Sequence, residues 1–144
     1  MEQPLYIVWK DEYNLGVNII DEQHRGLIST INSFFYSIQE GDGIKVAKPA
    51  VRILNEYVKI HFDTEEALLK KMNYPDLDAH MAQHRQLMEK TNEIALKIKT
   101  EHDAWELMPF LKKWWIDHIL EEDQKFIDLY RKNQQPKSSY RDWY

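Results

Sequence analysis

The sequence predicts an all-α protein: an antiparallel up-down four-helix bundle with an N-terminal arm and a short C-terminal extension. Apolar residues recur at helical spacing in four segments. Turn residues such as Gly41-Asp42-Gly43 separate these segments. Histidines lie on the apolar faces of all four, as in a site built inside a bundle. We expect residues 1–132 to form the bundle, with residues 1–20 as the arm and 133–144 as a tail.

The arm is expected to pack on the bundle. Pro4 and Gly16 interrupt any helical stripe there, but the segment also carries apolar residues such as Ile7 and Trp9. The first helix should begin near Asp21, a residue type that favours the N-cap position. It should end at Gly41.

The other three helices follow from the same periodicity. The second runs from about Ile44 to Met72, and Asn73–Asp76 form the turn after it. The third extends from Leu77 to about Ile98. A loop near residues 101–103 leads into the fourth helix.

Composition and charge narrow the class of protein. The chain has 144 residues, enough for one domain with a real core. A net charge of −5 argues against nucleic acid or an anionic membrane surface as partner. The absence of cysteine excludes disulfides, zinc–thiolate sites and iron–sulfur clusters. There is no apolar run of the ~20 residues that a membrane span needs and no signal-peptide pattern, so we expect a cytoplasmic protein.

Five histidines and a glutamate have the spacing of a metal site. His61 and Glu65, like His80 and His84, are four residues apart and project from one face of a helix. His24 lies on the apolar stripe of the first helix. One histidine on such a stripe is more often a hydrogen-bonded core residue than a ligand, but several on facing stripes favour coordination. Metal binding offsets the cost of burying these groups in a low dielectric.

The fourth helix is less regular, because His118 and Asp123 are five residues apart. That spacing is roughly 140° around a regular helix, so the two side chains would flank the site from either edge. A local π-bulge would bring them together. Glu122 is nearer to His118 in angle and is the rival carboxylate. Geometry leaves this choice open.

Imidazole and carboxylate ligands without thiolate suit iron, manganese, copper or zinc. Seven ligands are too many for one ion, whereas two ions bridged by carboxylates use them well. Suppose that Glu65 and Asp123 each bridge the two ions and that an oxide or hydroxide also joins the ions. All but one of the coordination positions of two octahedral ions are then filled. Such a centre is suited to binding one small diatomic molecule.

Several sequence runs resemble the hemerythrin family, particularly single-domain bacterial hemerythrins. They are Ile20–His24, His61–Glu66, Met72–Pro75, His80–His84 and Trp114–Asp123. The similarity covers about residues 5–132. It implies two iron ions with a bridging oxide or hydroxide, and reversible binding of dioxygen.

The resemblance also implies a role for each ligand. One iron would take His80, His84 and His118, and the other His24 and His61. The resemblance selects Asp123 over Glu122, so that Glu65 and Asp123 bridge. The open position would lie on the iron with two histidines.

The chain departs from the family pattern at Trp115, where many members carry leucine. We expect Trp115 and Ile119 to line the oxygen pocket, with ordinary core filling as the alternative for Trp115. The tail from Asn133 extends beyond the family domain. His102 matches no family motif and should be a surface residue.

The expected function is to carry, store or deliver dioxygen, with no enzymatic turnover. Two alternatives use the same centre: an oxygen or redox sensor, and a di-iron enzyme that handles peroxide or nitric oxide. The expected partners are dioxygen and an oxygen-consuming client protein. The chain should be a monomer or a small homo-oligomer.

Overall fold

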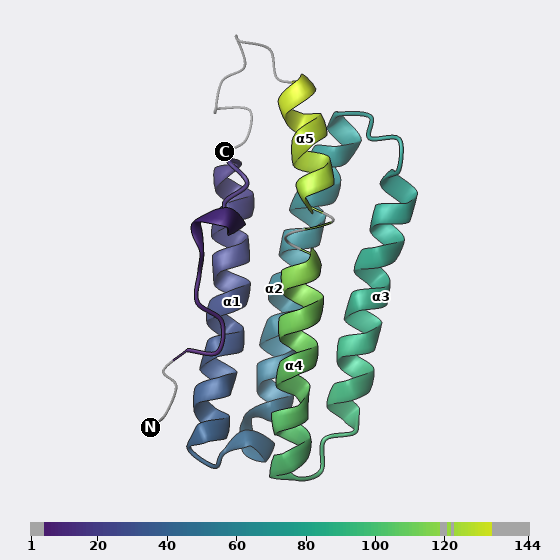
Figure 1. Ribbon diagram of the computed structural model, residues 1–144. Coiled ribbons are helices and arrows are strands. Elements are labelled where there is room, and N and C mark those ends of the chain that lie inside the picture. Colours follow the sequence, from purple (N-terminus) through teal and green to yellow (C-terminus); the bar gives the residue numbers. More distant parts are fainter. Residues whose placement is uncertain (1–4, 119–120, 122, 134–144) are drawn as a thin grey trace.

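The computed structural model describes residues 5–118, 121 and 123–133 (Figure 1). Its helices are η1 (Asp11–Tyr13), α1 (Asn18–Gln39), α2 (Gly43–Lys71), α3 (Leu77–Leu96), α4 (Glu101–Asp117) and α5 (Asp123–Asn133). The described residues contain no β-strand. The prediction of an all-α four-helix bundle is confirmed.

The predicted fourth helix consists of two helices, α4 and α5, that follow one another along the bundle (Figure 1). His118 and Glu121 between them adopt π-helical geometry. A π-turn inserts an extra residue into the helical repeat, and such turns are frequent at functional sites. The break therefore falls at a candidate metal ligand.

The first helix begins at Asn18, three residues earlier than predicted. Asp21 lies inside the first turn instead of capping it. Its carboxylate accepts hydrogen bonds from the backbone N–H groups of Leu15, at 2.8 Å, and Gly16, at 3.1 Å. The difference arises because Asp21 satisfies donors in the arm, which sequence periodicity does not reveal.

The arm lies along α1 in an extended path (Figure 1). Asn32 of α1 accepts from the backbone N–H groups of Tyr6 and Ile7 and donates to the Ile7 carbonyl at 2.8 Å. Arg25 lies over the Trp9 ring, 4.8 Å from its centroid. Side chains of α1 thus replace the backbone partners that an extended segment needs.

Two apolar clusters fill the interior. The larger contains Leu27, Val58, Leu87 and Trp115, and the smaller contains Ile20, Leu68 and Ile127. In α1 the residue His24 falls between members of the two clusters, and His61 and Glu65 do the same in α2. The candidate ligands therefore form a polar layer between two apolar ones.

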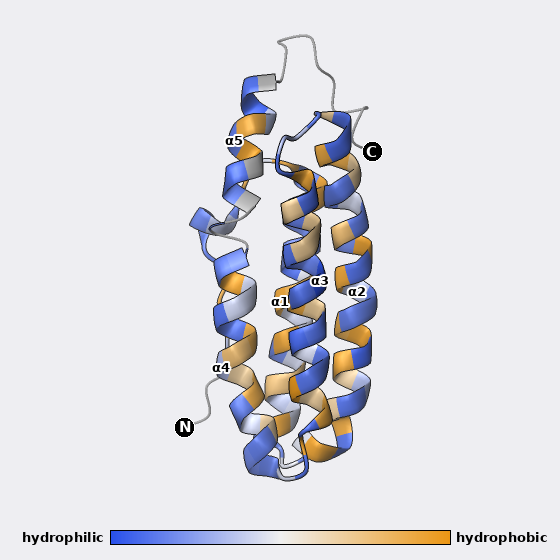
Figure 2. Ribbon diagram, turned by 90° about the vertical axis from the view of Figure 1, so that its right-hand side faces the viewer, coloured by the Kyte–Doolittle hydropathy of each residue, from blue (hydrophilic) through white to orange (hydrophobic). Residues whose placement is uncertain are grey.

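Hydrophilic and apolar residues alternate along every bundle helix (Figure 2). None of the described helices has an apolar stretch long enough to cross a membrane.

Candidate metal centre

Four helices bring the candidate ligands together. His24 comes from α1, His61 and Glu65 from α2, and two histidines from α3; His118 follows directly after α4. One group joins Glu65 with His80, His84 and His118, and a second joins Glu65 with His24 and His61. Within each group the candidate ligand atoms lie within 4.8 Å of one another. Glu65 is the only described residue that belongs to both groups.

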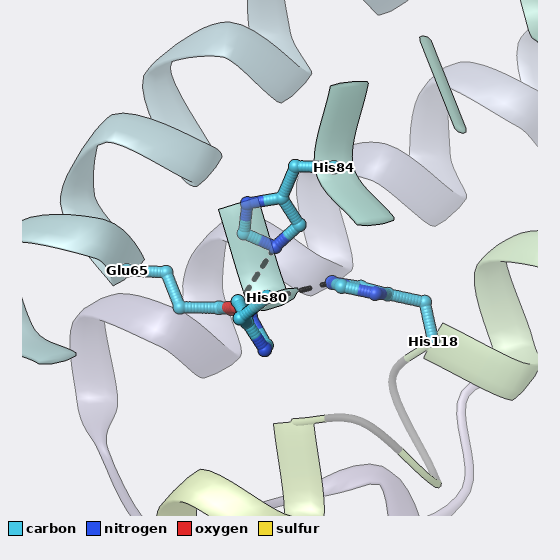
Figure 3. A group of neighbouring side chains, drawn as sticks. All are labelled: Glu65, His80, His84 and His118. Carbon is cyan, nitrogen blue, oxygen red and sulfur yellow. Dashed lines mark hydrogen bonds and ion pairs between the residues drawn. The ribbon is translucent and has the colours of Figure 1, made fainter. Parts of the chain in front are cut away.

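The two oxygens of Glu65 face different histidines. Its Oε1 contacts Nε2 of His80 and lies 3.1 Å from Nε2 of His84 (Figure 3). The His118 Nε2 lies 3.9 Å from the same oxygen. On the other side, Oε2 is 3.2 Å from Nε2 of His61. A carboxylate placed in this way can bind one ion through each oxygen.

These side chains are almost fully buried. Glu65, His24 and His61 have no exposed surface, and His118, the most accessible of the five candidate histidine ligands, is 6% exposed. A buried carboxylate and five imidazoles would be costly as an isolated polar cluster. As a donor set they fit first-row transition metals, which imidazole and carboxylate bind together. The residues present therefore fit a binuclear metal site.

Gln23 orients the His61 ring. The Nδ1–H group of His61 donates to Gln23 Oε1 at 3.0 Å, and Gln23 Nε2 donates to Thr64 Oγ1 at 3.1 Å. A hydrogen bond at Nδ1 leaves the Nε2 lone pair directed into the cluster. Gln23 precedes His24 in the sequence, but its side chain contacts the ring of His61 on α2.

Glu66 plays the same part for His84, and sequence analysis missed it. Its Oε2 accepts from His84 Nδ1 at 2.8 Å. Consecutive residues lie about 100° apart on a helix, so Glu66 is off the face that Glu65 defines. The sequence signal that could have identified Glu66 is its position directly after Glu65, a predicted ligand.

Phe62 is a second residue of the site whose role the sequence did not predict. It stacks on the His84 ring with centroids 3.7 Å apart and an interplanar angle of 5°. It is buried and contacts the larger apolar cluster. The His84 ring is therefore held by a hydrogen bond at its edge and by an aromatic ring on its face.

A close approach of α1 and α2 brings His24 and His61 together, with ring centroids 4.7 Å apart. At Gly26, two residues after His24, a Cβ atom would overlap the Tyr57 ring of α2. Burial, and to a lesser extent the charge of Glu22, raises the pKa of Tyr57. A larger residue at Gly26 would therefore displace the Tyr57 ring from its place against α1.

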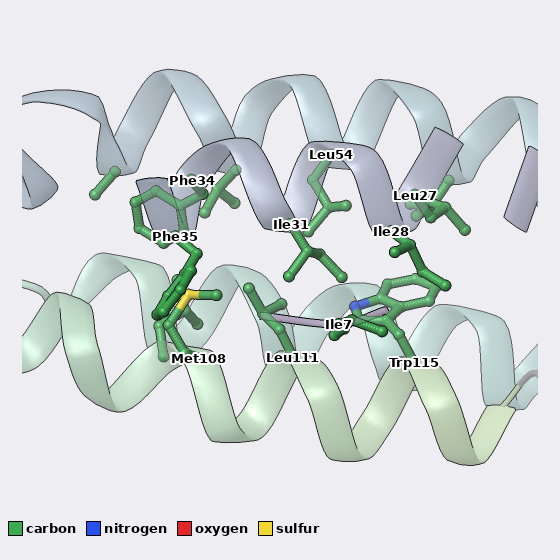
Figure 4. Packing of buried hydrophobic residues seen from close by; sticks show 14 of the residues in the cluster. Ile7, Leu27, Ile28, Ile31, Phe34, Phe35, Leu54, Met108, Leu111 and Trp115 are labelled. Atoms are coloured by element: carbon green, nitrogen blue, oxygen red, sulfur yellow. The ribbon is translucent and has the colours of Figure 1, made fainter. Parts of the chain in front are cut away.

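Trp114 and Trp115 have different surroundings. Trp115 is 1% exposed and lies in the larger apolar cluster (Figure 4). Its ring is stacked 5.9 Å from Phe62 and lies 6.2 Å from the His118 ring. Trp114 is 37% exposed and lines a surface pocket of about 330 Å³ that also reaches Leu87 and His118. Trp115 is thus the tryptophan in the dry interior beside the candidate ligands.

Two predicted site residues, Ile119 and Asp123, lie wholly or partly outside the described part of the chain. Ile119 lies outside the described residues, as does the rival carboxylate Glu122. Asp123 is the first residue of α5, but its side chain is not among those described. The π-turn at His118 is the geometry that would bring the His118 and Asp123 positions onto one face.

His102 lies outside the cluster. Its Nε2 pairs with Glu106 at 2.8 Å, and the side chains are 79% and 67% exposed.

Comparison with known proteins identifies the family of the chain. The model of the hemerythrin HHE cation-binding domain matches residues 15–130. A bacteriohemerythrin of Clostridium acetobutylicum is 32% identical over 127 residues, which cover 84% of this chain and 98% of that protein. A bacteriohemerythrin of Stenotrophomonas maltophilia is 29% identical, covering 85% and 80%. A hemerythrin-like protein of Naegleria gruberi is 30% identical, covering 82% and 88%. The resemblance found in the sequence motifs is confirmed, and the chain belongs to the hemerythrin family.

Proposed function

We propose that this protein binds dioxygen reversibly at a non-heme di-iron centre, and so carries, stores or delivers oxygen. The observation that carries the proposal is Glu65, whose two oxygens face separate groups of histidines. His24 and His61 would bind one iron. His80, His84 and His118 would bind the other. Glu65 and Asp123 would bridge them, together with an oxide or hydroxide.

When bound, the iron pair supplies reversible electron exchange with dioxygen at an open position. The protein's part is to orient the ligands and exclude water. Gln23 and Glu66 each accept a hydrogen bond from an imidazole Nδ1–H, which fixes the tautomer. Phe62 and Trp115 pack beside the cluster and limit the access of water to it. Exclusion of water suppresses proton leakage and side reactions at such a centre.

The apolar surroundings favour binding over turnover of a second substrate. Phe62 and Trp115 pack against candidate ligands, and each is at most 3% exposed. We further propose a cytoplasmic location, which suits a chain without cysteine, and delivery to an oxygen-consuming client.

The test is an optical titration of the reduced protein. A carrier should develop a charge-transfer spectrum on exposure to oxygen and lose it when oxygen is removed, over repeated cycles. Sustained consumption of peroxide or nitric oxide would instead identify an enzyme. Rapid one-way oxidation with no recovery of the reduced form would contradict reversible binding.

Asp123→Ala should reduce the iron content, because Asp123 would supply a bond to each iron. Glu122→Ala should keep both ions, since Glu122 would supply none. Metal analysis of the two variants checks this assignment. Loss of iron only from Glu122→Ala would show that the neighbouring carboxylate is the ligand.

Trp115→Leu should speed autoxidation of the oxygenated protein while the iron content is unchanged. A smaller side chain beside Phe62 and His118 opens space in the dry interior and admits water. The measurement is the decay of the oxygenated spectrum, together with the rate of azide binding to the oxidised form.

Trp114→Leu is the matched control, because it removes the same ring from the half-exposed neighbour. We expect a much smaller effect on autoxidation, since Trp114 lines a pocket already open to solvent. If Trp115→Leu and wild type autoxidise at the same rate, Trp115 is only core filling.

A further inference from the structure

The last turn of α5 is tied to the arm across the bundle. Arg131 donates from Nη2 to the backbone carbonyl of Leu15 at 2.8 Å. The two residues are 116 positions apart in the sequence. A hydrogen bond from a charged guanidinium is stronger than one between neutral groups. The contact therefore connects the C-terminal helix to the N-terminal arm.

The arm at this point is itself fixed to α1. The Asp21 carboxylate accepts from the N–H groups of Leu15 and Gly16. Gly16 has φ +95°, and a Cβ there would lie 3.1 Å from Arg131 Nη2. The positive φ favours glycine, and a side chain there would crowd the Arg131 guanidinium. Asp21 lies three residues before His24, so a continuous set of hydrogen bonds runs from α5 through the arm to a helix that carries a candidate ligand.

The position of α5 matters because Asp123 is its first residue. His118 and Glu121, which precede it, have π-helical geometry instead of the regular α-helical geometry of α4. Contacts further along α5 hold the helix against the rest of the bundle. Ile127 and Tyr130 supply apolar contacts to the smaller cluster around Leu15 and Val17. Arg131 adds a directional polar contact at the far end.

We propose that Arg131 is a positioning residue for the metal centre, acting with Asp21. By holding α5 against the arm, it limits the opening of the segment that begins at Asp123. This inference rests on the proposed role of Asp123 as a ligand. It predicts that iron leaves the centre through local opening of α5, and that Arg131 slows this step.

The experiment compares iron release from Arg131→Ala and Lys132→Ala. Lys132 is the matched control because it is also exposed, lies in the same last turn and carries the same charge. Each variant removes one positive charge near the C-terminus of α5, so the two lose a similar favourable interaction with the helix dipole. All proteins are first loaded with iron. Transfer of iron to an external chelator should be about tenfold faster from Arg131→Ala than from wild type, as expected when a charged hydrogen bond is lost. Lys132→Ala should match wild type.

Two further variants distinguish positioning from general stability. Asp21→Asn keeps the shape of the side chain but removes its charge, so it should also speed iron release. Arg131→Lys retains a donor and should recover part of the effect. The spectrum of the azide complex should change in Arg131→Ala and not in Lys132→Ala.

The outcomes are separable. Wild type that holds no iron would overturn the proposed function itself. Wild type that holds iron, with equal release rates and spectra for Arg131→Ala and Lys132→Ala, would overturn the positioning role alone. A lower melting temperature of the iron-free Arg131→Ala variant with unchanged iron release would show that the contact only stabilises the fold, and would also overturn it.

Discussion

Replacing Glu65 with alanine is expected to reduce iron from two ions per chain to well below one. Glu65 is the only described residue shared by both groups of candidate ligands. Its loss removes a bond to each ion at once and leaves the imidazoles of His61 and His80 without their shared carboxylate. Iron content of the purified variant is the measurement.

Glu66→Ala is the control for this change. It removes an adjacent carboxylate of the same charge, which contacts the outer nitrogen of His84. Loss of such an outer hydrogen bond costs about 10–100-fold in metal affinity, so the variant should still be isolated with both ions. A Glu65→Ala protein that retained both ions, or a larger loss in Glu66→Ala, would show that Glu65 does not join two metal sites.

Removing iron should lower the melting temperature by roughly 10 °C or more. A ligand present at about 1,000 times its dissociation constant stabilises a fold by about 4 kcal/mol, which for a chain of this size is a shift of that order. The physical cause is the buried layer of imidazoles and Glu65 between the two apolar clusters. Thermal melts of the reduced protein before and after complete chelation give the shift.

The Glu65→Ala variant supplies the comparison for the melts. Chelation should barely change its melting temperature, since it holds little iron to lose. An equal shift in this variant would mean that the chelator acts elsewhere on the chain. An unchanged melt of the wild type after complete removal would show that the buried cluster does not need metal.

The sequence was sufficient for the four-helix pattern and for the positions that meet in the core. Apolar spacing placed His24, His61 and His80 on inward faces, and the structure brings all three to the same layer. This success has a simple reason. A residue on the buried stripe of an amphipathic helix has only the bundle interior to occupy.

Contacts made at the edges of those stripes were not predictable. Glu66 reaches His84 from beside the inward face, and Asp21 turns back to the arm instead of capping its own helix. Both depend on side-chain direction and on segments distant in sequence. The Arg131–Leu15 contact spans most of the chain, and no periodic pattern encodes it.

The two adjacent tryptophans show the same limit. Both lie in a helix rich in apolar residues, and the sequence singled out Trp115 only through comparison with a family pattern. The structure buries Trp115 and leaves Trp114 over a third exposed. About 100° of rotation between consecutive residues decides which ring faces the interior.

In the proposed centre, one buried carboxylate, that of Glu65, joins two metal sites. Anomalous X-ray diffraction from crystals of the iron-loaded protein, collected on both sides of the iron absorption edge, tests it most directly. We predict two iron peaks on opposite sides of the Glu65 carboxylate, one among His80, His84 and His118, and the other beside His24 and His61. A single peak, or two peaks bound by only one of these histidine groups, would contradict it.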